Sequence, residues 1–254
     1  MKQNLGIYRS FVAIVVSMFV FGPIILFAFE SLEGLDFAEY RALFERTELS
    51  KTFAQSVVVA AASVAFSCLI GVPAAYFASR VEGAKSTVLY LTALSLWLAP
   101  PVALSIQVYQ WYRSFHLYDS LAGMILLYGV LGAALTVVVV KPFFDQLPSR
   151  IDELAWQDGY NGVETLRQII APRIGMIVAG TAALVFTQSW NELLFASLLT
   201  DQKVSLLPVR ILGLTTGNRL YWGQISAASV IAIAPALIVI AGLLIHQMKT
   251  SKKT

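Results

Sequence analysis

The chain has few of the residues that enzymes and metal sites most often use. Cys68 is its only cysteine, which excludes an internal disulfide and leaves no cysteine pair for a zinc site. We expect Cys68 to serve as a small apolar residue inside a helix. His116 and His246 are the only histidines, and they lie far apart without metal-ligand spacing. Because the sequence also lacks a Gly-x-Ser-x-Gly motif and an acidic pair suited to general acid–base chemistry, it predicts no catalytic residue and no metal site.

Charged residues are also scarce. They make up 13% of the 254 residues, whereas soluble domains carry roughly 25%. Hydrophobic residues make up 57%, and the mean hydropathy is +0.72. A charge at the bilayer centre costs at least ~2.5 kcal/mol, so this composition suits a surface that faces lipid. The net charge of +3 includes no long run of Lys and Arg, so nucleic-acid binding gains no support. The composition predicts one integral membrane domain over residues 1–254.

Six segments are long and apolar enough to cross a bilayer. A spanning helix needs about 20 mostly apolar residues, and exposed backbone amides find no partner in lipid, so every span must be helical. The first segment follows Lys2 and Arg9 as in a signal peptide, but its bulky end offers no cleavage site, so we interpret it as a retained anchor. Pro100 and Pro101 should break or kink the third segment. The sequence thus predicts an all-α polytopic membrane protein with spans at about 11–29, 53–79, 87–108, 121–140, 174–199 and 225–246.

The distribution of Lys and Arg predicts that both chain termini are cytoplasmic. With six spans in that orientation, the inside segments hold eleven Lys and Arg and the outside segments hold seven. Lys249, Lys252 and Lys253 near the C-terminus strengthen this bias. The longest cytoplasmic loop is then 141–173, which connects spans 4 and 5.

A short helix is predicted at the start of residues 149–172 in this loop. Ser149 and Asp152 stand at the spacing of a capping box, so the helix should begin there. Gly159 suits the left-handed conformation that ends a helix, and Asp158 before it suits the turn.

A second short helix should follow the glycine. Asn161 and Glu164 form another cap-like pair, and the helix should stop before Pro172. Each of the two helices has one apolar stripe. Either the stripes pack against the ends of the membrane helices, or they present a docking surface to a cytoplasmic partner. The two stripes comprise Ile151, Leu154 and Ala155, and then Val163, Leu166, Ile169 and Ile170.

The same residues resemble the permease loop motif of binding-protein-dependent ABC importers. That motif reads Glu-Ala-Ala, three residues, Gly, nine residues, Ile, one residue, Leu, Pro. The chain matches this spacing without a gap and departs at two positions, where Leu154 replaces the first Ala and Ala171 replaces the Leu. The resemblance implies a coupling role for Glu153, Leu154, Ala155, Asp158, Gly159, Ile169 and Pro172.

Other stretches resemble the carbohydrate-uptake branch of that family, in particular its six-helix maltose-transporter-type permease subunit. The resemblance implies the type I ABC importer permease fold and a place in a bacterial or archaeal inner membrane. It also implies that the chain forms half of the translocation pathway for a sugar or related polyol, with a non-sugar solute such as glycerol-phosphate as the alternative. The stretches that carry it are 37–44, 71–80, 100–101, 190–196 and 206–208.

The partners follow from the same resemblance. In that family the loop is a coupling helix that seats in a cytoplasmic ATPase subunit, whose closure switches the pathway between inward- and outward-facing states. The chain lacks a Gly-x-x-x-x-Gly-Lys-Ser/Thr loop, so we expect no directly bound cofactor, with ATP and Mg held by the partner. The expected partners are two ABC ATPase subunits, a second permease of different sequence, an external solute-binding protein and membrane lipid. A stand-alone channel, a secondary transporter or a membrane enzyme would leave the loop motif unexplained.

The fifth span carries polar residues that are candidates for the translocation pathway. Polar groups within a membrane usually face the bundle interior or a water-filled path. Helix packing or solvation at the membrane boundary is the alternative, and Trp190 can instead be an anchor at the outer boundary. The pathway candidates are Gln188, Ser189, Asn191 and Glu192.

The external loop 200–224 is rich in glycine, arginine and aromatic residues. The resemblance implies that such a loop touches the solute-binding protein, whereas the residues alone are equally consistent with a solvated connector. The candidates for that contact are Arg219, Tyr221 and Trp222.

Overall fold

The computed structural model describes residues 48–215 and 222–251, together with scattered positions between 15 and 41. Helices and their connections make up these residues, and no strand occurs among them. The first expected span, 11–29, is described only at scattered positions between 15 and 29, and these positions are helical. The chain divides into two compact units, one of residues 1–51 with 210–237 and one of residues 52–209 with 238–254. The second unit holds the whole of 149–192 and is the main subject below.

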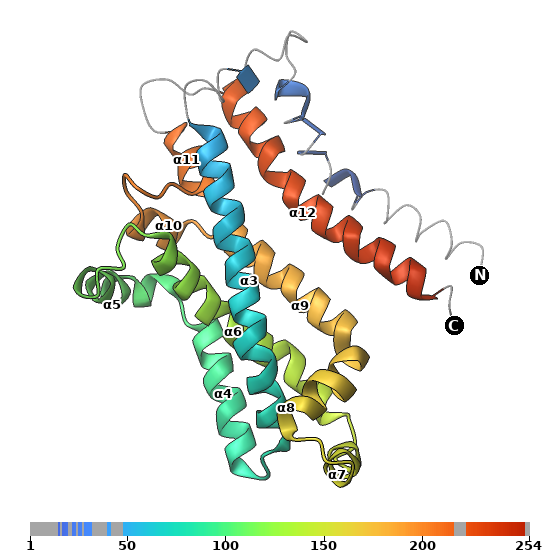
Figure 1. Ribbon diagram of the computed structural model, residues 1–254. Helices are drawn as coiled ribbons and strands as arrows, with labels where there is room; N and C mark the ends of the chain where they lie inside the picture. The colour runs from blue at the N-terminus through green and yellow to red at the C-terminus, as the bar shows by residue number, and fades with distance from the viewer. Residues whose placement is uncertain are drawn as a thin grey trace. The chain divides into compact units, whose positions relative to one another are not determined.

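Four helical segments of the described residues are long and apolar enough to cross a membrane. The second, fourth and sixth expected spans coincide with three of these segments, while the fifth expected span begins in the remaining one. An additional pair of helices makes a fifth span if the pair is counted as one (Figure 1). The four segments are α3 (Leu49–Arg80), α6 (Leu121–Asp145), the continuous stretch Gly162–Asn191, and Trp222–Val239 within α12 (Trp222–Ser251).

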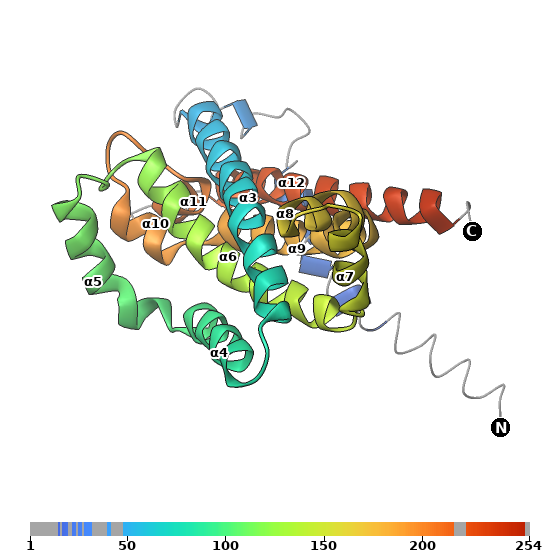
Figure 2. The ribbon, with the colours of Figure 1, turned by 60° about the horizontal axis from the view of Figure 1, so that its bottom comes forward.

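The bent pair confirms the predicted break in the third span. α4 (Ala84–Leu98) and α5 (Pro101–Ser114) meet at 90°, and Figure 2 shows α5 turning away from α4. A proline disfavours the helical conformation in the residue before it, and Ala99 and Pro100 each precede a proline. Their ψ angles are 126° and 121°, which is extended backbone. Pro101 then begins α5, where its missing N–H costs nothing.

α3 and α6 approach each other closely through small residues. A methyl group added to Gly71 would lie 2.6 Å from Cβ of Thr136, so only glycine permits this approach. The Ser67 hydroxyl donates to the carbonyl oxygen of Gly129 at 3.0 Å, which joins the two helices where lipid offers no other partner.

The fifth expected span does not run unbroken over 174–199. α9 (Ala171–Asn191) ends before Glu192, and the chain resumes as α10 (Leu194–Leu199) and then α11 (Leu207–Gly213). The ψ of Glu192 is 120°, which takes it out of the helix. Hydrophobicity alone does not reveal this break, because apolar residues continue on both sides of it.

Two apolar clusters hold the larger unit together at its opposite ends, which we call the α7 end and the α10 end. α3 and α6 extend from one end to the other (Figure 1). The cluster at the α7 end includes Tyr76, Val140, Phe144, Leu166, Ile170 and Ile174. The cluster at the α10 end includes Val59, Met124, Tyr128, Phe195, Leu199 and Leu206.

Candidate functional site

The segment 149–172 contains α7 (Arg150–Gln157), which ends as the sequence predicts. Gly159 has a φ of +88°, the left-handed conformation in which glycine is favoured. The Gly159 N–H donates to the carbonyl of Trp156 at 3.1 Å, and the Tyr160 N–H donates to that of Ala155 at 2.9 Å. This pair of bonds is the Schellman motif, which satisfies the last carbonyl groups of the helix.

α7 begins where the sequence predicts, but the predicted capping hydrogen bond of Ser149 is not formed. Ser149 precedes the helix, but its backbone is itself helical and its side chain makes no capping hydrogen bond. A side chain caps a helix from an extended residue, so the conformation of Ser149 prevents the predicted bond. The Asp152 carboxylate instead turns towards α3.

The second capping box is confirmed, but the helix that it opens does not stop before Pro172. The Asn161 carboxamide oxygen accepts from the backbone N–H of Glu164 at 2.9 Å, and the Glu164 carboxylate accepts from that of Asn161 at 2.8 Å. The chain then runs through α8 (Gly162–Glu164) and the π-helix η1 (Thr165–Ile170) directly into α9. Pro172 lies in the first turn of α9, where proline is tolerated. The wider π-helical turn before it lets the helix continue.

The apolar residues of this segment separate into two faces. Ala155, Leu166 and Ile170 are buried, and the latter two join the cluster at the α7 end. Leu154, Trp156 and Val163 are 49%, 62% and 64% exposed. The predicted apolar stripes are therefore only partly buried. Leu154 and Val163, which belong to the stripes, are exposed, and so is Trp156, which does not belong to them. We call Leu154, Trp156 and Val163 together the exposed apolar face of the segment, in which Leu154 and Trp156 point to different sides of α7 because they are two residues apart. The other motif residues are exposed, except for half-buried Ile169, and comprise Glu153, Asp158, Gly159 and Pro172.

A buried polar cluster that sequence reasoning missed connects α7 to α3 and α6. Nε of Arg80, the last residue of α3, lies 2.7 Å from Oδ2 of Asp152, and the Tyr76 hydroxyl donates to Oδ1 of the same carboxylate. Nη1 of Arg80 also donates to the carbonyl oxygen of Phe144 at 3.1 Å, near the end of α6. We call Arg80, Asp152 and Tyr76 the α7 joint. An arginine at the end of an apolar span was the only sequence signal for it.

The joint borders a cavity of about 210 Å³ at the α7 end. Its wall also includes Phe77, Ser149, Glu153, Trp156 and Gly162. The cavity thus lies between the end of α3 and the two short helices of the segment, beside the exposed apolar face.

The pathway candidates of the fifth span separate at the helix break. The Glu192 carboxylate accepts from the backbone N–H groups of Leu194, Phe195 and Ala196 at 3.0–3.1 Å and from the Tyr128 hydroxyl at 2.8 Å. Both carboxylate oxygens are therefore engaged inside the protein. The Glu192 side chain therefore caps the start of α10 from the position before its N-cap residue, Leu193, which is a favourable place for a negative charge.

The neighbours of Glu192 have unlike surroundings. Gln188 and Asn191 are exposed, while Ser189 is buried. Trp190 is 3% exposed and lies between the rings of Phe53 and Phe186, at centroid distances of 5.6 and 5.8 Å. The alternative that Trp190 is a boundary anchor is therefore wrong within this chain, because packing between helices covers its ring. Lining of the pathway stays a prediction for all four candidates.

A second carboxylate that the sequence did not single out holds the loop after α10. Asp119, between α5 and α6, accepts from the backbone N–H groups of residues 201, 202, 203 and 204 at 2.9–3.2 Å. Partial burial alone would raise the pKa of Asp119, but the four donors hold that pKa below its usual value. At the start of α3, the Gln55 and Ser56 side chains accept from the backbone N–H groups of Ser205 and Leu207.

The binding-protein candidates lie at the edge of the described chain. Arg219 and Tyr221 lie outside the described residues, and Trp222 is exposed at the start of α12. Within the smaller unit, Trp222 lines a cavity of about 460 Å³ together with Pro23, Leu26, Glu30 and Ser226.

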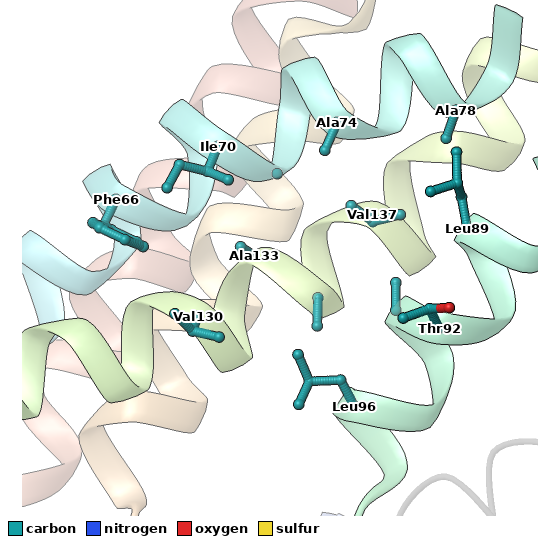
Figure 3. A pocket seen from close by; sticks show the side chains of 13 residues that line it. Phe66, Ile70, Ala74, Ala78, Leu89, Thr92, Leu96, Val130, Ala133 and Val137 are labelled. Atoms are coloured by element: carbon teal, nitrogen blue, oxygen red, sulfur yellow. The ribbon is translucent and has the colours of Figure 1, made fainter. Parts of the chain in front are cut away.

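An apolar groove of about 330 Å³ lies between α3, α4 and α6 (Figure 3). Phe66 and Ile70 border it from α3, and Leu89 and Leu96 border it from α4. Thr92 carries the only side-chain hydroxyl in its wall, and that hydroxyl donates to its own helix at the carbonyl of Val88. The groove therefore offers a polar solute nothing to bind.

The apolar helices define a helical membrane protein. One chain in the crystal structure of a bacterial ABC transporter involved in the import of the acidic polysaccharide alginate has the same fold. The TM-score is 0.76 at 19% sequence identity, and the match covers 95% of this chain and 96% of that chain.

The chain belongs to the family of binding-protein-dependent transport system inner membrane components, whose sequence profile matches residues 7–247. It is therefore a permease subunit of an ABC importer, as the loop motif predicts. The trehalose transport system permease protein SugB of Mycobacterium tuberculosis is 26% identical over 205 residues, which are 80% of this chain and 75% of that protein. The trehalose/maltose transport system permease protein MalG of Thermococcus litoralis is 30% identical over 186 residues, which are 72% and 66% of the two chains.

Proposed function

We propose that this permease subunit forms half of the translocation pathway for a sugar or related polyol, and that segment 149–172 docks on a cytoplasmic ATPase subunit. The observation that carries the docking role is the exposed apolar face. Leu166 and Ile170 of the segment are packed into the cluster at the α7 end, whereas Leu154, Trp156 and Val163 are 49–64% exposed in the described part of the chain. Three large apolar side chains exposed within one short segment favour a protein interaction site there.

The orientation of the chain supports this role. We place the α7 end and both chain termini in the cytoplasm. Lys141, Arg150, Arg167 and Arg173 lie on this end, and cytoplasmic segments carry the excess of Lys and Arg.

The energy for transport comes from partners in this proposal. The chain has no phosphate-binding glycine loop, so ATP and Mg bind to two ABC ATPase subunits and the permease moves mechanically. A second permease of different sequence completes the pathway, and an external solute-binding protein delivers the solute.

The names of the relatives support a carbohydrate as the solute. SugB transports trehalose, and the Thermococcus protein transports trehalose and maltose. A titration of the cognate solute-binding protein with sugars, polyols and glycerol-phosphate tests this class. Saturable binding of a sugar or polyol supports it, and binding of glycerol-phosphate alone contradicts it.

The docking role is tested with a matched pair of tryptophans. Trp156 on α7 and Trp111 on α5 are each 62% exposed. We expect Trp156→Ser to weaken co-purification of the ATPase subunits by about tenfold or more, as loss of an aromatic anchor does at interfaces. Trp111→Ser should leave co-purification unchanged. Equal co-purification for both variants would contradict docking through the exposed apolar face.

A further inference from the structure

The α7 joint places one buried ion pair where three helices meet. Arg80 contributes from α3, Asp152 from the first turn of α7, and the guanidinium also bonds a carbonyl of α6. The side chains of Arg80 and Asp152 are only 19% and 7% exposed. The Tyr76 ring lies beneath the guanidinium, 5.4 Å from its central carbon, and the Tyr76 hydroxyl engages the second carboxylate oxygen.

Such a joint resists movements that apolar packing tolerates. The Arg80 guanidinium forms an ion pair with the Asp152 carboxylate and donates a hydrogen bond from Nη1 to the carbonyl oxygen of Phe144, so it needs α7 on one side and α6 on the other. If α7 slid or rotated away from α3, it would leave a charge buried without its partner, which is strongly unfavourable. The apolar contacts of Ala155 and Leu166 do not fix the position of α7 in this way, because apolar packing does not depend on charge or on hydrogen-bond direction.

The joint lies beside the exposed apolar face in the same helix. Asp152 precedes Leu154 by two residues and Trp156 by four, so Asp152 and Trp156 are one turn apart. A force applied to the exposed apolar face therefore reaches α3 and α6 through the first turn of α7.

We infer that the α7 joint is a positioning element that makes α7 move as one body with α3 and α6; this inference rests on the docking role proposed above. Without the joint, α7 still docks on the ATPase subunit, but it shifts relative to α3 and α6 and does not move them. ATP hydrolysis then continues while solute transport falls.

The test uses the complete importer in vesicles with its solute-binding protein, and it measures solute taken up per ATP hydrolysed. Asp152→Asn keeps the shape of the side chain and removes its charge. We expect the ATPase subunits to stay bound and the uptake-to-hydrolysis ratio to fall by about tenfold, within the usual range of coupling energies. Tyr76→Phe removes one hydroxyl and no charge, and should lower the ratio by a smaller factor of about two.

Lys141 and Asp145 provide the matched control. Their ion pair of 2.9 Å lies within α6 and connects no two elements. Asp145→Asn therefore removes a carboxylate charge at the same end of the unit and should keep the wild-type ratio.

A wild-type uptake-to-hydrolysis ratio in Asp152→Asn would overturn the inference. If uptake and hydrolysis fall together at that ratio, the joint has a purely structural role. Uptake by wild-type vesicles without ATPase subunits would instead contradict the proposed function and is measured separately.

Discussion

The two ends of the larger unit hold their connecting segments by different chemistry. At the α10 end, the carboxylates of Asp119 and Glu192 accept hydrogen bonds from backbone N–H groups of the segment that they hold. At the α7 end, the segment is held by its own side chains, through the Asp152 carboxylate and a buried apolar face. The carboxylate bonds at the α10 end therefore do not depend on which residues supply the N–H groups, whereas the ion pair at the α7 end depends on two particular side chains.

The difference fits the transmission of movement proposed for the α7 end. Bonds to the backbone fix the path of a loop and leave its side chains free to face outward. A side-chain ion pair between helices fixes the relative position of rigid bodies, which is what transmission of movement requires. Substitutions at the two ends should therefore differ in what they change.

The largest effect is expected at the glycine of the α7 segment. Gly159→Val places a β-branched residue at a φ of +88°, which such residues strongly disfavour. Solute uptake should be abolished while membrane insertion survives, as measured by vesicle uptake and by extraction of the membrane fraction.

A second glycine provides a control that distinguishes the effect of backbone strain from the effect of its place in the chain. Gly83, between α3 and α4, has a φ of +69° and open space around it, like Gly159. Gly83→Val should retain uptake although it carries similar strain. Equal loss of uptake in both variants would remove any special role for the α7 segment.

A smaller effect is expected at the α10 end, on stability. Glu192→Ala removes the acceptor of three backbone N–H groups and of the buried Tyr128 hydroxyl. We expect a loss of about 2–4 kcal/mol in unfolding free energy, from a lost cap and an unsatisfied hydroxyl. Thermal unfolding of the purified importer in detergent measures it. Glu192→Gln keeps one acceptor oxygen and should lose about half as much; an unchanged midpoint in both variants would contradict the capping role.

Asp119 adds a dependence on pH. Because its pKa is lowered in the folded protein, its stabilisation is complete above the ordinary aspartate value of about 3.9 and is lost as the pH falls through the lowered value. Amide-exchange protection of residues 201–204 should thus hold from pH 7 to about 4 and then decrease. Asp119→Asn should lower that protection at pH values above about 4, at a cost of about 1–2 kcal/mol, and remove its dependence on pH. A wild-type profile in the variant would contradict the clamp.

The smallest effect is expected for an exposed side chain in the loop at the α10 end. The Lys203 side chain is exposed, and the residue bonds Asp119 and Gln55 only through its backbone. Lys203→Ala should change the unfolding free energy by less than about 0.5 kcal/mol, as at ordinary surface positions. A larger loss in the same thermal measurement would show that side chains also hold the α10 end.

Local patterns predicted the features that neighbouring residues decide. The proline pair that breaks the third span, the left-handed Gly159 and the capping box of Asn161 and Glu164 each depend on residues within a few positions. The end of the second short helix was mispredicted, because a π-helical turn let the chain pass Pro172 into α9. Ser149 failed as a cap because its backbone is helical and not extended.

The sequence by itself determined that this protein lies in a membrane, that it is helical, and where its permease loop motif stands, because hydrophobicity and backbone preference are properties of short stretches. Only the tertiary structure decided which carboxylates do structural work. Asp152 meets Tyr76 across 76 residues, Glu192 meets Tyr128 across 64, and Asp119 meets the loop after α10 across more than 80. Such pairings depend on how the helices pack, and a buried charge accepts whichever partner that packing provides.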